Sequence, residues 1–89
     1  MLALATCYCN DIYREAQRLG LEVKEVEVEA SAEFSGVGLG ASNVQYKARI
    51  SSGASEEQIA RLLQETDAVA EVQNTLRAGS SVTRVRWQV

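Results

Sequence analysis

The sequence has 89 residues and a net charge of −3, and 46% of its residues are hydrophobic and 24% charged. A chain of this length predicts one folding unit over residues 1–89, and so ordinary a composition argues against disorder. Because it has neither a concentrated basic surface nor a run of about 20 apolar residues, we expect no nucleic acid and no membrane as a partner.

Residues 2–19 predict a long amphipathic helix that carries both cysteines of the chain, Cys7 and Cys9. Apolar residues recur along it at spacings of three and four, which is the pattern of one buried stripe. The stripe consists of Leu2, Ala5, Cys9, Ile12, Ala16 and Leu19. Cys9 therefore falls on the predicted core face, whereas Cys7 belongs to a second row that turns polar further along. We expect Gly20 to end the helix in a left-handed conformation, and the lack of a capping residue before Leu2 indicates a missing upstream segment.

Two strands are expected next, because apolar residues alternate with polar ones over residues 25–34 and again over residues 44–50. The parity changes just before the first strand, which predicts a bulge near Lys24 and Glu25. Residues 35–42 are rich in glycine and predict a turn; a GVGLG sequence between two strands is not the setting of a nucleotide-binding loop. If the strands pair, their charged faces meet, with Lys47 and Arg49 near Glu25, Glu27 and Glu29.

Two helices and a final strand complete the predicted order. Residues 55–58, with the sequence SEEQ, form a capping box that begins a helix. Thr66 and Asp67 predict a second N-cap, followed by a short helix that ends at Gly79. Residues 80–89 alternate again and predict a strand in which Trp87 is a core or interface anchor. The order helix, strand, strand, helix, helix, strand predicts an α+β domain with an antiparallel sheet.

The chain contains no histidine, which excludes a Ser–His or Cys–His catalytic pair within it. The same absence leaves a poor ligand set for zinc, so we expect no metal site, and we expect no cofactor. The glutamate row of the first strand is interpreted as a solvated sheet face. Two closely spaced cysteines are too few for a secreted disulfide scaffold, which favours a reducing, cytoplasmic location.

The predicted order and two local sequences resemble the C-terminal part of the OsmC (osmotically inducible protein C) family, which includes the organic hydroperoxide resistance proteins. The local sequences are ATCYCND at residues 5–11 and VAEVQNTLR at residues 69–77. The resemblance runs from Leu2 to Val85, and the strands that precede the family's central helix are expected to be absent. It implies an intertwined homodimer whose central helices pack together, with the site at the subunit interface and a role under oxidative stress.

The resemblance also implies the site residues. In the family, a cysteine on the central helix attacks a hydroperoxide, and this position matches Cys7, with Asp11 in the neighbouring acidic position. The resolving cysteine of two-cysteine members matches Ala70, so the resolving thiol is absent and an external thiol is expected to recycle Cys7. Cys9 cannot replace it, because residues two apart on a helix point about 200° away from each other. The family's activating arginine and glutamate lie upstream of the nucleophile, and Arg14 is a distant substitute.

Two functions remain open at this point. The first is thiol-dependent reduction of a small organic hydroperoxide or hydrogen peroxide by Cys7, with activity weakened or lost because the resolving and activating groups are missing. The second is a non-enzymatic dimeric binding or interaction module that keeps the OsmC-like core and holds a small apolar ligand between its helices.

Overall fold

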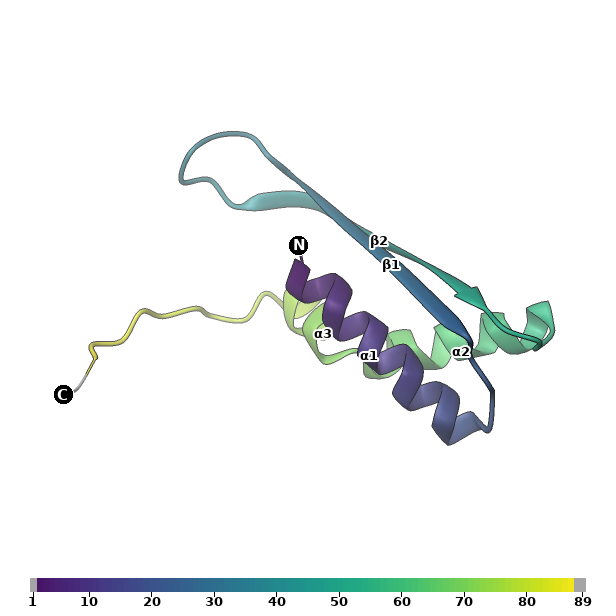
Figure 1. Ribbon diagram of the computed structural model, residues 1–89. Helices are drawn as coiled ribbons and strands as arrows, with labels where there is room; N and C mark the ends of the chain where they lie inside the picture. Colours follow the sequence, from purple (N-terminus) through teal and green to yellow (C-terminus); the bar gives the residue numbers. More distant parts are fainter. Residues whose placement is uncertain (1, 88–89) are drawn as a thin grey trace.

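Three helices cover one face of a two-stranded antiparallel sheet in the computed structural model, which describes residues 2–87 (Figure 1). The predicted α+β class and antiparallel sheet are confirmed. In chain order the elements are α1 (Leu2–Leu19), β1 (Glu25–Phe34), β2 (Ala41–Ser51), α2 (Glu56–Val69) and α3 (Glu71–Ala78). Helix α1 contacts the sheet through β1 and also contacts α2 and α3, so it lies at the centre of the fold.

Helix α1 ends as its sequence predicts. Gly20 has a φ of 74°, and the N–H of Leu21 donates to the carbonyl of Ala16 at 2.8 Å. Only a residue that tolerates the left-handed region closes a helix in this way without strain, and glycine does so because it has no Cβ.

The buried face of α1 is rotated from the predicted stripe. Its buried residues are Leu4, Tyr8, Asp11, Ile12, Glu15 and Ala16. Leu2 is exposed and Cys9 is only half-buried, so the prediction that both belong to the core face is wrong. A single apolar stripe is expected where a helix packs on one neighbour, but α1 packs on the sheet and on two helices at once. Polar residues therefore enter its buried side, where Arg14 and Arg18 of the same helix pair with the carboxylates of Asp11 and Glu15.

The hairpin has the predicted charge register. Glu27 pairs with Arg49 and Glu29 with Lys47 across the two strands, and both pairs form salt bridges, with 3.3 Å between Lys47 Nζ and Glu29 Oε2. Because all four side chains are largely exposed, each pair contributes only about 0.2–1 kcal/mol. The charges therefore select the register more than they stabilise the sheet.

The irregularity in the hairpin is not where the sequence placed it. The register shifts between Ser31 and Glu33, instead of near Lys24 and Glu25. Residues 21–24 form a connection ahead of β1, so their parity requires no bulge. The N–H of Lys24 donates to the carbonyl of Ser51 at 2.9 Å, which aligns this connection with the end of β2.

The capping box of α2 is present as predicted. The hydroxyl of Ser55 accepts from the Gln58 N–H at 3.2 Å, and the Gln58 side chain accepts from the Ser55 N–H at 2.9 Å. The predicted second N-cap at Thr66 and Asp67 is wrong, because α2 continues through both residues. The Thr66 hydroxyl donates back to the carbonyl of Leu62 at 2.7 Å, the usual use of a threonine inside a helix.

Helix α3 begins after Ala70 without a side-chain cap and ends where the sequence predicts. Gly79 has a φ of 68°, and its N–H reaches back to the last turn of the helix. The core lies between this helix pair, α1 and the sheet. Its most buried members are Tyr8, Ile12, Ala16, Leu62 and Ala70, with partly buried side chains of β1 and β2 packed against them.

The expected final strand is not formed over residues 80–87, and the last two residues of that expectation lie outside the described residues. After Gly79 the chain runs away from the hairpin (Figure 1), so its alternating apolar residues meet no sheet edge. Val82, Val85 and Trp87 are exposed, with Trp87 at 84%. Trp87 is therefore no core anchor within this chain.

Substitution of Ser55 by alanine removes the oxygen that caps the first turn of α2. We expect Ser55→Ala to lose about 1 kcal/mol of the free energy of unfolding, measured by urea denaturation followed by circular dichroism. Ser80→Ala is the matched control, because the exposed Ser80 side chain contacts only the neighbouring carbonyl of Ser81. The control should change by less than about 0.5 kcal/mol. Equal losses in the two variants would contradict the capping role.

Candidate functional site

Both cysteines lie in the second and third turns of α1 as free thiols, and both are half-buried. Cys7 precedes and Cys9 follows Tyr8, whose ring is buried in the core. The helix therefore holds the two sulfurs on opposite flanks of the buried face. This placement agrees with the expectation that they do not pair within one chain.

Asp11 follows Cys7 by four residues, so the two side chains share one side of the helix. Asp11 as a whole residue is 6% exposed, and its Oδ1 lies 3.4 Å from Arg14 Nη2. The other oxygen, Oδ2, is buried without a hydrogen-bond partner among residues 2–87. Burial raises the pKa of Asp11 above its ordinary value, the negative charge of Glu71 adds to this, and Arg14 opposes it. The role that the family resemblance gives Asp11 stays a prediction.

Arg14, the cation nearest to Cys7 on the predicted row, is occupied by carboxylates. Its guanidinium lies 3.4 Å from Asp11, 3.6 Å from Glu15 and 3.3 Å from Glu71. A cation shared among three carboxylates has little attraction left for a thiolate about two turns, or roughly 10 Å, away along the helix. Arg14 thus joins α1 to α3, and we assign it no role in activating Cys7.

Ala70, the position matched to the family's resolving cysteine, is fully buried at the junction of α2 and α3. It belongs to the same core cluster as Tyr8, the residue next to Cys7. The side chain at this position is a methyl group, so the junction has no thiol that could form a disulfide with Cys7.

A tyrosine–aspartate network, which sequence reasoning missed, joins four elements. The hydroxyls of Tyr8 on α1 and Tyr46 on β2 both donate to Asp67 Oδ1 on α2, at 2.7 and 2.6 Å. Arg77 Nη2 on α3 donates to the Tyr46 hydroxyl at 2.6 Å. The two rings meet edge to face with centroids 4.8 Å apart. These contacts join residues far apart in sequence, and no local pattern marks them.

Both phenols of this network keep their protons at neutral pH. Burial raises the pKa of Tyr8 far above its ordinary value, and the hydrogen bond to Asp67 raises it further. Burial likewise raises the pKa of Tyr46, followed by its bond to Asp67, while Arg77 acts in the opposite direction. Two protonated phenols that share a carboxylate are hydrogen-bond donors, so the network positions elements and offers no general base.

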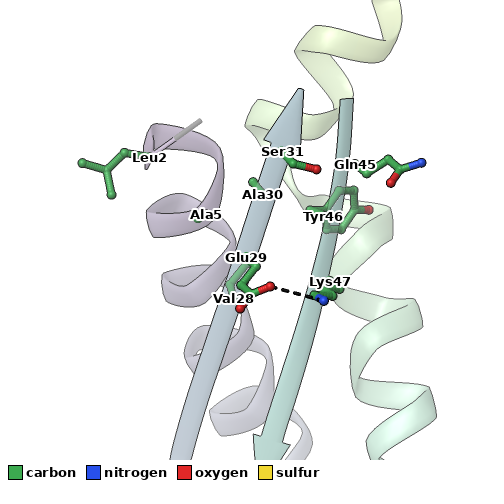
Figure 2. Close-up of a pocket in the computed structure, with 9 residues that line it drawn as sticks. All are labelled: Leu2, Ala5, Val28, Glu29, Ala30, Ser31, Gln45, Tyr46 and Lys47. Carbon is green, nitrogen blue, oxygen red and sulfur yellow. Dashed lines mark ion pairs between the residues drawn. The ribbon is translucent and has the colours of Figure 1, made fainter. Parts of the chain in front are cut away.

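A hollow of about 570 Å³ lies between the beginning of α1 and the sheet (Figure 2). Leu2 and Ala5 line it from α1, and the remaining lining residues come from the middle of the hairpin: Val28, Glu29, Ala30, Ser31, Gln45, Tyr46 and Lys47. The ion pair between Glu29 and Lys47 crosses its edge. Of the residues that the structure describes, neither cysteine lines this hollow.

Across residues 2–87, no group of three or more metal-ligating side chains comes together. Over the same residues, each helix is either too short or too polar to cross a membrane.

The family model described as OsmC-like protein matches residues 1–84, which is nearly the whole sequence. The chain therefore belongs to the OsmC-like family. No match was found among curated proteins.

The buried carboxyl of Asp11 makes a testable prediction about pH. The pKa of Asp11 is raised in the folded state, so ionisation of Asp11 disfavours folding. The stability that the protonated carboxyl contributes to the fold is therefore fully present below the ordinary pKa near 3.8, and it is lost as the pH rises through the raised pKa of the folded state. We therefore expect Asp11→Asn to raise the melting temperature at pH 7 and to leave it nearly unchanged at a pH below the ordinary value.

Glu22→Gln is the matched control, because the Glu22 side chain is exposed. It should leave the melting temperature unchanged at both pH values. A lower melting temperature for Asp11→Asn at pH 7 would show that the ion pair with Arg14 outweighs the unpaired, buried oxygen.

Proposed function

We propose that this OsmC-like protein is a thiol-dependent hydroperoxide reductase of low activity, with Cys7 as the peroxidatic thiol. The observation that carries this function is family membership over residues 1–84. The resemblance of the cysteine motif assigns the site to Cys7 and Asp11, which both lie on α1. The half-burial of Cys7 further supports it, because a reactive thiol must be reached by its substrate and yet shielded from bulk water.

The reaction has two half-reactions. The Cys7 thiolate attacks the distal oxygen of the hydroperoxide, the O–O bond breaks, and the leaving alkoxide takes a proton to become an alcohol while Cys7 becomes a sulfenic acid. An external dithiol then attacks that sulfur and releases water, and its second thiol displaces Cys7 as a thiol and leaves the reductant oxidised. We expect slow turnover because Ala70 supplies no resolving thiol and Arg14 is shared among carboxylates.

The proposal includes a homodimer in which the central helices pack together, in the reducing cytoplasm. A hairpin alone is marginally stable in water, and this one has its helix-free face and both edges uncovered by other described elements. Large apolar side chains are exposed on the hairpin, on α1, on α3 and along the tail: Leu2, Phe34, Val37, Leu39, Val44, Leu76, Val82, Val85 and Trp87. Apolar surface of this extent supports burial against a second copy.

A second candidate function is a non-enzymatic dimeric binding module. It is favoured by the hollow in Figure 2, whose small apolar side chains Ala5, Val28 and Ala30 can accept an apolar ligand while the cysteines lie elsewhere. Such a module requires no reactive thiol, so the two candidates differ in their dependence on Cys7.

Loss of peroxide distinguishes the two functions. The purified chain is mixed with cumene hydroperoxide and excess dithiothreitol, and the remaining peroxide is followed with time. We expect slow, catalytic consumption that Cys7→Ser abolishes and Cys9→Ser, the matched control, retains. Full activity in Cys7→Ser would refute the assignment of the thiol, and no consumption by the unmodified chain would favour the binding module.

The assembly is tested separately by size-exclusion chromatography with light scattering at micromolar concentration. We expect a particle of twice the chain mass. Trp87→Ser should shift it toward the monomer because it removes the largest exposed apolar side chain of the tail, whereas Arg84→Ser removes a neighbouring exposed residue and should not. A folded monomer of the unmodified chain would contradict the homodimer.

A further inference from the structure

A second hollow, of about 210 Å³, lies where β2, α3 and the beginning of α1 meet. Its lining is half apolar and half polar: Leu4, Val44, Tyr46, Gln73, Leu76 and Arg77. Sites for drug-sized ligands occupy about 300–1,000 Å³, so this hollow suits a smaller molecule. No carboxylate is among its described lining residues, which argues against a cationic ligand.

Arg77 is held firmly and yet its charge is unpaired. Nη2 donates to the Tyr46 hydroxyl at 2.6 Å, Nη1 donates to Asn74 Oδ1 at 3.2 Å, and the guanidinium carbon lies 5.9 Å from the centroid of the Tyr46 ring. Within residues 2–87 its guanidinium forms no salt bridge, unlike those of Arg14, Arg18 and Arg49. A preorganised guanidinium with free N–H groups is a good partner for a carboxylate, which it can bind through two oxygens.

Gln73 supplies the second observation. Its side chain is 2% exposed, and neither Nε2 nor Oε1 has a hydrogen-bond partner among the described residues. A buried amide without partners is costly, and leucine of similar size would pack at this position without that cost. A polar ligand group in the hollow would give the Gln73 amide the hydrogen-bond partner that it lacks.

We infer that this hollow binds a small aliphatic carboxylate. The ligand's carboxylate meets the Arg77 guanidinium and accepts from Gln73 Nε2, and its short chain lies against Leu4, Val44 and Leu76. Inorganic phosphate fits less well, because one guanidinium balances only part of its charge and three apolar side chains gain nothing from it. The binding uses no thiol and so stands apart from the peroxidase proposal.

The probe is sodium hexanoate, titrated into the ¹⁵N-labelled full chain and followed by two-dimensional NMR. We expect saturable shifts confined to the residues that line the hollow, including the side-chain amide of Gln73. Hexan-1-ol keeps the chain without the charge, and inorganic phosphate keeps a negative charge without the chain. Both should bind at least about tenfold more weakly than hexanoate, because the alcohol loses the charged hydrogen-bonded contact and phosphate loses the burial of the apolar chain.

Two variants separate binding from structure. Arg77→Gln should weaken hexanoate binding by about tenfold or more, while Arg61→Gln, an exposed arginine on α2, should leave it unchanged. Gln73→Leu should weaken binding and at the same time keep or raise the melting temperature, because it removes an unpaired buried amide. A merely structural glutamine would instead lower the melting temperature when replaced.

Three results would overturn this site: no saturable binding of hexanoate, equal affinity for hexan-1-ol or phosphate, or unchanged affinity in Arg77→Gln. Binding by Cys7→Ser should equal that of the unmodified chain. Failure of peroxide reduction therefore leaves this site untouched, and loss of hexanoate binding leaves the peroxidase assignment untouched.

Discussion

One carboxylate oxygen, Oδ1 of Asp67, joins the parts of this small fold. It accepts from a phenol on α1 and from a phenol on β2, and the second phenol in turn accepts from Arg77 on α3. The most buried apolar residues of the core are few, so the fold gains less from apolar burial than a larger domain would. Hydrogen bonds to a charged acceptor contribute about 1.5–3 kcal/mol each, roughly the value of a buried aliphatic side chain. The network therefore carries much of the contact between sheet and helices.

Further along α1, charged pairs take the place of the tyrosine hydrogen bonds. Arg18 lies 2.9 Å from Glu15 on its own helix and 3.1 Å from Glu65 on α2, and Arg14 bridges in the same manner to Glu71 on α3. These arginines are half-exposed, so their attraction is screened, but they neutralise a buried glutamate that would otherwise be costly. Helix α1 thus packs apolar side chains against the sheet and against Leu62 and Ala70, and it adds charged pairs with α2 and α3 beside them. Because buried Asp11 and Glu15 belong to this charged part, the hydrophobic stripe alone is a poor guide to the burial of α1.

The features that were predictable from sequence are those decided within a few residues. Gly20 and Gly79 end helices because only their own backbone is involved, and Ser55 caps because its partner Gln58 lies three residues away. The strand alternation is local in the same way, and the charge register follows from it once the two strands pair across the hairpin. The predicted N-cap at Thr66 is wrong because a threonine hydroxyl can cap a helix or, as here, donate to a carbonyl within one. The predicted strand over residues 80–87 is wrong because alternating residues form a strand only where a sheet edge can pair with them, and none lies beside these residues.

The candidate site was predictable only in its spacing. Four residues separate Cys7 from Asp11 in the sequence, but which way the helix turns them depends on contacts formed elsewhere. Tyr8, between the two cysteines, donates to Asp67, a residue 59 positions further along. That bond, together with the core packing of Ile12 and Ala16, orients α1 about its axis and so sets the flank on which each sulfur lies. The accessibility of Cys7 thus depends on contacts with residues far along the chain, and the cysteine motif alone does not predict it.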